Sequence, residues 1–154
     1  MKVFWSWQSD TLGKIGRHFV RDAISAAISA IKGNVDILEP ESRGSLHIDH
    51  DRQGVAGSPE LAQTILKKIE QSAVFIADVT PVGFISTDLN EGSKKLINSN
   101  VGIELGYALH ALSDASILMV MNEFYGRHED LPFDLRSKAG PITFKLSPDA
   151  SRAE

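Results

Sequence analysis

Glu104 is the residue of this sequence whose neighbours best suit it for chemistry. It follows Asn100, a favourable helix cap, and apolar residues recur with a helical period from about residue 101 to residue 112. Glu104 then lies in or just past the first turn of that helix, at the margin of its apolar stripe. A carboxylate placed there can act on a ligand, but the helix dipole alone also favours it. Position by itself favours the second interpretation.

Polar residues also follow three short apolar runs, at residues 3–5, 73–77 and 117–121. If these runs are parallel strands, the residues beyond their carboxyl ends meet at one edge of the sheet, where ligands bind. The candidates are Ser6, Gln8, Ser9 and Asp10 after the first run, Asp78 and Thr80 after the second, and Asn122 and Glu123 after the third. The alternative is that strand-to-helix loops are polar anyway, and that Asp10 or Asp78 only caps a turn.

The elements that must position these residues can be read from the same runs. The runs do not alternate with polar residues, which is typical of parallel strands buried on both faces. Two weaker segments, residues 35–38 and 142–144, complete five expected strands, and helical patterns lie between them. This alternation predicts an α/β fold, a flavodoxin-like doubly wound five-stranded parallel sheet with right-handed crossovers.

Three helices are expected to cover the sheet. The first has an apolar stripe and ends at Gly33 and Asn34; the stripe is Val20, Ile24, Ala27, Ile28 and Ile31. The second begins with Ser58 as N-cap, Pro59 at the first helical position and Glu60 in the first turn, and it buries Leu61, Ile65 and Ile69. The third, capped by Asn100, turns Val101, Leu105, Ala108 and Leu112 toward the sheet.

The composition suits one soluble domain. The chain has 154 residues, 42% of them hydrophobic, and we expect residues 1–146 to form the domain and residues 147–154 a polar tail at its edge. The absence of cysteine excludes disulfides and thiolate metal sites. No apolar run is long enough for a signal peptide or a membrane span, so a cytoplasmic location is expected. A net charge of −4 without a basic stripe argues against nucleic acid as a partner.

Other motifs are weak or absent. Neither GxGxxG nor GxxxxGK[ST] occurs, so both standard phosphate-binding loops are missing. Residues 54–58 could bind a phosphate through backbone N–H groups, although a mobile loop leading to a helix cap explains them better. His47, Asp49 and Asp51 would share a face of an extended segment, but we expect no metal site there.

Residues 100–108 read NVGIELGYA, which resembles the NxxxELGYA signature of bacterial TIR-like (Toll/interleukin-1 receptor-like) domains. Further blocks of the resemblance are residues 5–10, 49–51 with 57–59, 75–80 and 131–134, so it covers nearly the whole domain. The chain departs from the family at Ser99, where relatives often carry proline, which affects the rigidity of the helix entry more than the chemistry. A more distant similarity is to the nucleoside 2-deoxyribosyltransferases, whose nucleophilic glutamate precedes a glycine in a comparable helix.

The resemblance implies cleavage of the bond between nicotinamide and ribose in NAD, with NAD as substrate and Glu104 as the catalytic glutamate. Nicotinamide leaves a cationic pyridinium as a neutral molecule, so one carboxylate that stabilises the oxocarbenium-like ribose is sufficient. Ordinary glycosides need a second carboxyl group to protonate the departing oxygen. By location, Asn100, Asp78 and residues 6–10 would hold ribose hydroxyls, and Trp5, Trp7 or Tyr107 would stack on a ring.

The resemblance also implies an effector domain of antiphage defence that is activated by self-association into an oligomer or filament. In relatives such domains are often fused to a sensor for a cyclic nucleotide. Residues 52–57 are rich in glycine and favour a mobile half-site that a neighbouring copy completes. Two alternatives stay open, a non-catalytic TIR-like interaction module and a nucleoside 2-deoxyribosyltransferase. A two-component receiver is disfavoured, because one acid follows the first strand where a receiver has an adjacent pair.

Overall fold

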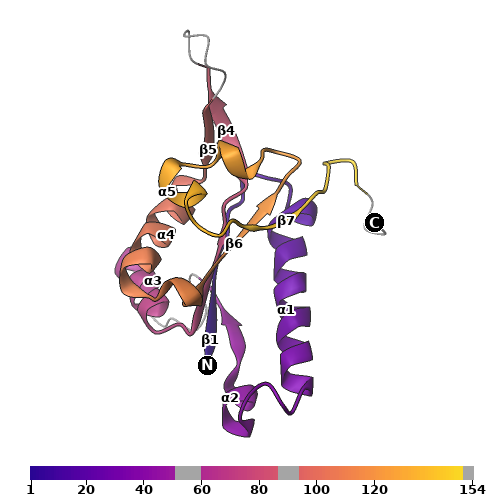
Figure 1. The fold of residues 1–154 in the computed structure, drawn as a ribbon, viewed down its shortest axis with the longest axis vertical. Helices are drawn as coiled ribbons and strands as arrows, with labels where there is room; N and C mark the ends of the chain where they lie inside the picture. Colours follow the sequence, from indigo (N-terminus) through magenta and orange to yellow (C-terminus); the bar gives the residue numbers. More distant parts are fainter. Residues whose placement is uncertain (51–59, 87–93, 151–154) are drawn as a thin grey trace.

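The computed structural model describes residues 1–50, 60–86 and 94–150. Its central sheet has five parallel strands, β1 (Lys2–Ser6), β2 (His47–Asp49), β3 (Val74–Asp78), β6 (Ile117–Asn122) and β7 (Ile142–Phe144). They lie in the order β2-β1-β3-β6-β7, so the chain first steps outward from β1 and then returns past it (Figure 1). This is the flavodoxin-like order, and the predicted fold class is confirmed.

The second strand is not where the sequence predicted it. Residues 35–38 form an exposed turn, in which Asn34 Oδ1 accepts a hydrogen bond from the Asp36 N–H at 3.0 Å. Val35 and Ile37 are 70% and 54% exposed. The strand is instead His47–Asp49, which follows the short helix α2 (Pro40–Ser45) and pairs with β1 from Lys2 onward. Local apolar content therefore gave a wrong prediction here.

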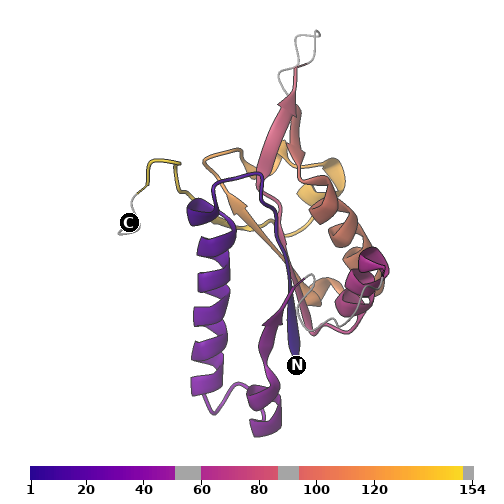
Figure 2. The same cartoon turned by 180° about the vertical axis from the view of Figure 1, so that it is seen from behind.

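One face of the sheet is covered by helix α1 (Arg17–Gly33), which the 3-10 turn η1 (Gly13–Ile15) precedes (Figures 1 and 2). The helix ends at Gly33 as predicted. Its predicted stripe is buried at Val20, Ile24 and Ile28, but Ala27 is exposed. These residues pack on side chains of β1, β3 and β6 that point to this face, namely Val3, Trp5, Ile76 and Val120.

The opposite face is covered by α3 (Leu61–Glu70), α4 (Ser99–Ala111) and the short α5 (Phe133–Arg136). Figures 1 and 2 show α3 and α4 side by side, across the sheet from α1. Here Phe4 and Phe75 stack with ring centroids 5.9 Å apart, within a core that includes Leu105. Helix α3 begins one residue after Glu60 and not with Glu60 in its first turn. The predicted N-cap Ser58 and the predicted first helical residue Pro59 lie outside the described residues.

An antiparallel hairpin of β4 (Pro81–Ile85) and β5 (Lys94–Ile97) separates β3 from α4, and the sequence did not predict it. It projects beyond the carboxyl ends of the parallel strands (Figure 1). Two further 3-10 turns, η2 (Asp114–Ser116) and η3 (His128–Asp130), flank β6. Among the described helices, none is both long and apolar enough to cross a membrane.

Candidate functional site

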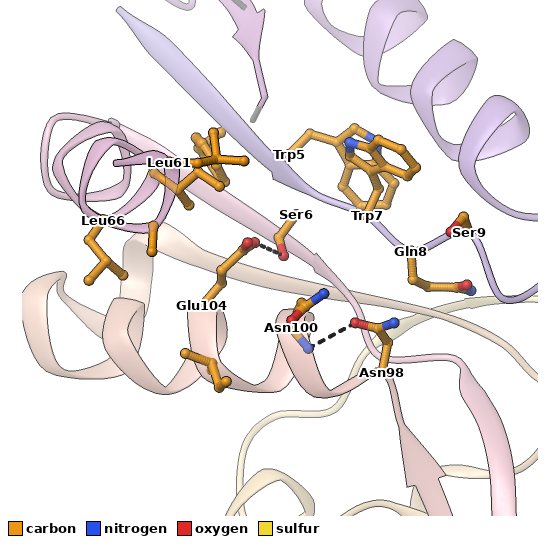
Figure 3. A pocket seen from close by; sticks show the side chains of 14 residues that line it. Trp5, Ser6, Trp7, Gln8, Ser9, Leu61, Leu66, Asn98, Asn100 and Glu104 are labelled. Atoms are coloured by element: carbon orange, nitrogen blue, oxygen red, sulfur yellow. Dashed lines mark hydrogen bonds between the residues drawn. The ribbon is translucent and has the colours of Figure 1, made fainter. Parts of the chain in front are cut away.

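A pocket of about 580 Å³ opens at the carboxyl end of β1, where α3 and α4 meet the segment that follows the strand (Figure 3). This is the point at which the strand order reverses, the usual ligand position in a doubly wound sheet. Its volume lies in the range of small-molecule sites. The lining residues are Phe4, Trp5, Ser6, Trp7, Gln8, Ser9, Leu61, Ala62, Ile65, Leu66, Asn98, Asn100, Ile103 and Glu104.

Among the described residues of this lining, Glu104 is the one with an ionisable side chain. It lies in the second turn of α4, half-buried, beside the fully buried Val101 and Leu105 that fix the helix to the sheet. Ser6 is the last residue of β1 and is 1% exposed. Its hydroxyl donates a hydrogen bond to Glu104 Oε2 at 2.5 Å (Figure 3). A hydrogen bond to a carboxylate is stronger than one between neutral groups, so Ser6 holds this carboxylate in place.

Asn98, and not Asn100 as predicted, caps helix α4. Its Oδ1 accepts hydrogen bonds from the backbone N–H of Asn100 at 2.9 Å and of Val101 at 3.1 Å. Its Nδ2 donates to Asp10 Oδ2 at 2.7 Å, which ties the loop after β1 to the start of α4. Asn100 lies in the first turn and still lines the pocket (Figure 3). Both asparagines satisfy the sequence signal for a cap, so the sequence alone did not distinguish them.

Asp78 supports the pocket from behind and is not part of its lining. It ends β3, is 1% exposed, and accepts hydrogen bonds from Gln8 Nε2 at 3.3 Å and from the Thr80 N–H at 3.0 Å. Burial raises the pKa of the Asp78 carboxyl above its ordinary value, and hydrogen bonds from Thr80 and Gln8 oppose part of that rise. Gln8 Oε1 in turn accepts from the N–H groups of Asp10 and Thr11, at 2.6 and 3.1 Å.

The predicted aromatic residues separate into two groups. Trp5 and Trp7 both line the pocket, Trp5 almost fully buried and Trp7 half-buried (Figure 3). Tyr107 is not brought to the pocket, because its hydroxyl donates to the Glu70 carboxylate of α3, and this bond raises the pKa of Tyr107. Ser9 lines the pocket at an exposed position.

The apolar wall of the pocket was missed at the sequence level. It is formed by α3, through Leu61, Ile65 and Leu66, and by Ile103 of α4, which is 68% exposed. The prediction had assigned Leu61 and Ile65 to the core alone and had not named Leu66. Ile103 falls outside the buried stripe of α4. An apolar residue on the outer side of this helix, next to Glu104, was the sequence signal that could have indicated the apolar wall.

The weaker motifs give no second site among the described residues. Asp49 is 8% exposed and its Oδ1 accepts a hydrogen bond at 2.8 Å from Lys68, so this ion pair fastens α3 to the end of β2. Asp51 and residues 54–58 lie outside the described part of the chain. Within residues 1–50, 60–86 and 94–150, no three histidine or carboxylate side chains gather as metal ligands would.

No protein-family model matches the chain, and a search of curated proteins finds no match either. Fold and site therefore define the class, a flavodoxin-like α/β domain with a carboxylate pocket at the point where the strand order reverses. Among enzymes of this architecture, that position is where substrates and cofactors bind.

Proposed function

We propose that this chain is a TIR-like NAD glycohydrolase that cleaves the bond between nicotinamide and ribose. The observation that carries the proposal is Glu104, one hydrogen-bonded carboxylate in a pocket whose other described lining residues are neutral. A single carboxylate suits a substrate whose leaving group needs no proton. The resemblance of residues 100–108 to the TIR-like signature supports the same assignment.

In this mechanism the C1′–N bond breaks and its electron pair stays on the nicotinamide nitrogen, which loses its positive charge. The ribose becomes an oxocarbenium ion, and Glu104 stabilises it by charge or bonds to C1′ for a moment. Water then adds to C1′ and releases a proton to the carboxylate or to solvent. The products are nicotinamide and ADP-ribose. Ser6 keeps the carboxylate oriented while the cation develops.

The remaining lining fits the parts of such a substrate. Leu61, Ile65 and Ile103 offer an apolar surface to a ring, and Trp5 and Trp7 add aromatic groups. The amides of Asn98 and Asn100 stand at the polar end of the pocket, where ribose hydroxyls would be bound (Figure 3). Asp78 and Asp10 act through Gln8 and Asn98, and we assign them to holding the loop and not to the substrate.

We further propose that the domain is an effector of antiphage defence that works as an assembly of copies, switched by a sensor for a cyclic nucleotide. The exposed apolar Ile103 at the pocket supports assembly, as do Phe84 and Ile85 of the projecting hairpin, 65% and 50% exposed. Packing between copies would cover these side chains and exclude water from Glu104. The glycine-rich segment 52–57, the predicted half-site, lies outside the described residues.

The test is incubation of concentrated or artificially clustered protein with NAD, followed by identification of the products. Glu104→Gln preserves shape but removes the negative charge, so activity should fall by about a hundredfold or more. Glu123→Gln is the matched control, because Glu123 is an exposed glutamate just beyond the end of β6 and outside the pocket lining. Unchanged turnover by the Glu104 variant would remove the catalytic assignment.

A parallel incubation with 2-deoxynucleosides separates the alternatives. A nucleoside 2-deoxyribosyltransferase would use the same carboxylate to exchange bases between 2-deoxynucleosides, and base exchange on deoxyadenosine without NAD consumption would establish it. Assembled protein that turns over neither substrate would support the non-catalytic interaction module. If the product is cyclised ADP-ribose or a dinucleotide with an exchanged base, Glu104 remains the catalytic residue. Only the group that attacks C1′ in place of water is then different.

A further inference from the structure

Among the residues that the structure describes, the lining of this pocket has one carboxylate, Glu104, and no lysine or arginine. NAD carries a diphosphate attached to the 5′ carbon of the nicotinamide ribose. When C1′ lies beside Glu104, this diphosphate is only a few bonds away and lies at the border of the pocket. A cation at the border of this pocket would attract the diphosphate and favour the binding of a dinucleotide.

Arg17 stands at this border. Its guanidinium carbon lies 5.2 Å from the ring centroid of Trp7, and Trp7 lines the pocket. The cation thus lies against one of the residues that line the pocket. Stacking on an indole holds a guanidinium in place while its N–H groups remain directed outward in the plane, the geometry that binds a phosphate with two hydrogen bonds.

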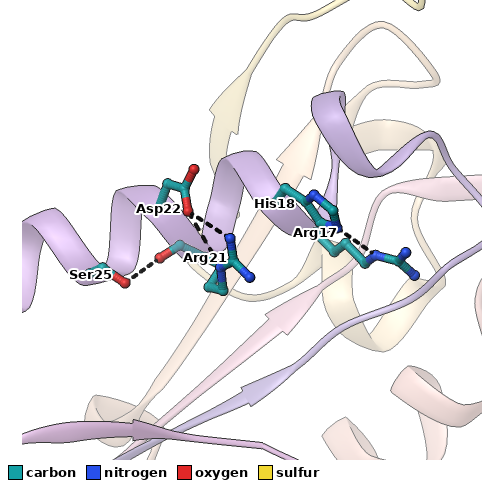
Figure 4. Close-up of polar contacts among 5 residues, drawn as sticks. All are labelled: Arg17, His18, Arg21, Asp22 and Ser25. Carbon is teal, nitrogen blue, oxygen red and sulfur yellow. Dashed lines mark hydrogen bonds and ion pairs between the residues drawn. The ribbon is translucent and has the colours of Figure 1, made fainter.

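The hydrogen bonds of Arg17 leave it available for such a ligand. Its Nε donates to His18 Nε2 at 3.1 Å, as Figure 4 shows. Within the part of the chain that the structure describes, its two terminal nitrogens have no hydrogen bond and no carboxylate partner. Arg21, one turn further along α1, is different because its NH2 group forms an ion pair with Asp22 at 3.1 Å (Figure 4).

The charge of the surrounding segment favours an anion. Residues 13–21 contain Lys14, Arg17 and Arg21 and no acidic residue, in a chain whose net charge is −4. The first turn of α1 likewise contains no acid. Lys14 Nζ donates to the carbonyl of Ala150 at 3.2 Å, so of these three cations Arg17 is the one placed against a pocket residue.

We propose that Arg17 binds the phosphate of a dinucleotide substrate and thereby makes the pocket select NAD over uncharged nucleosides. This inference rests on the proposed function. Arg17 acts in binding and specificity and does not touch the reacting C1′, so its loss should raise KM for phosphorylated substrates and leave kcat nearly unchanged.

The experiment compares wild type, Arg17→Gln and the control Arg21→Gln, with NAD and with nicotinamide riboside, which has the same scissile bond but no phosphate. Losing a charge-assisted contact should raise KM for NAD about tenfold or more in Arg17→Gln. Turnover of nicotinamide riboside should stay within about twofold of wild type, which also shows that the variant is folded. Added salt should raise KM for NAD in wild type and much less in the variant.

The outcomes separate this inference from the proposed function. If wild type cleaves neither substrate, the NAD glycohydrolase assignment is lost and this inference with it. If wild type cleaves NAD, and Arg17→Gln has an unchanged KM or loses activity equally on both substrates, only the role of Arg17 is overturned. If wild type accepts NAD but not nicotinamide riboside, the dissociation constants of ADP-ribose and adenosine test the role of Arg17 instead. Arg17→Gln must then weaken the binding of ADP-ribose and leave the binding of adenosine unchanged.

Discussion

Replacement of Ser6 by alanine tests whether the hydrogen bond from β1 to α4 contributes to catalysis. Ser6 Oγ and Glu104 Oε2 are 2.5 Å apart, and the two residues are separated by 98 positions in sequence. The alanine variant removes this donor and leaves the carboxylate in place. Ser6 has no contact with the substrate in the proposed mechanism other than through Glu104, so it is a positioning residue.

The magnitude follows from the burial of the two partners. A hydrogen bond to a charged group contributes about 1.5–3 kcal/mol. Ser6 is 1% exposed, but Glu104 is only half-buried, so water can replace part of the lost interaction and the lower end of that range applies. About 1.4 kcal/mol corresponds to a tenfold change in rate, so kcat for NAD should fall about tenfold.

The assay is kcat for NAD under assembly conditions, with Ser25→Ala as the control, since Ser25 is an exposed serine of α1 outside the described pocket lining. The control should remain within about twofold of wild type. In the background of Glu104→Gln, Ser6→Ala should cost much less, because residues that act as one unit are not additive. A full tenfold loss in that background, or no loss in the wild-type background, would refute the positioning role.

Three further predictions follow from other contacts. Burial raises the folded-state pKa of Asp78, so its contribution to the free energy of unfolding is complete below about pH 4 and is lost as pH rises through the raised pKa. Asp78→Asn should remove this pH-dependent loss when the free energy of unfolding is measured by urea denaturation at a series of pH values. Parallel pH dependences of wild type and variant would contradict the prediction. Lys68→Met should cost about 3 kcal/mol by leaving Asp49 unpaired, and adding Asp49→Asn should recover most of it in the same measurement. Specific activity on NAD should rise steeply with protein concentration and then saturate, whereas a flat plot would rule out assembly.

The principal strands of the fold were predictable because their sequence signal is local. The runs at β1, β3 and β6 are buried on both faces, and a wholly apolar run is sufficient to identify such strands. The edge strand β2 has only three residues, of which Ile48 alone is apolar. Its pairing with β1 decides its place, and pairing between distant segments leaves no local pattern.

The site was predictable to the extent that its residues adjoin strand ends. Ser6, Trp7 and Gln8 were expected at the carboxyl edge of the sheet and they line the pocket. Tyr107 was expected there from its nearness to Glu104 in sequence. Three positions along a helix is close to one turn, yet Tyr107 leans toward α3 and bonds to Glu70. The residue that the Tyr107 side chain contacts depends on how α3 packs against α4. The sequence of α4 by itself does not determine that packing.

The alternation of side chains along β1 relates Glu104 and Arg17 to each other. Successive residues of a strand point to opposite faces, so Phe4 and Ser6 share one face while Trp5 points to the other. Trp7, directly after the strand, packs on the same side as Trp5. Phe4 packs in the core beneath α3 and α4, and on that face Ser6 meets Glu104. Trp5 and Trp7 belong to the core beneath α1, and there Trp7 meets Arg17.

The end of β1 thus separates a carboxylate on one face from a cation on the other, and the pocket touches residues of both faces. A substrate bound over this strand end would have its cationic ribose on the side of Glu104 and its phosphate on the side of Arg17. Both contacts depend on the register of β1, in which Phe4 pairs with Phe75 and Ser6 with Ala77. A slip of one residue would exchange the two faces, so the apolar residues that fix this register also fix the polarity of the site.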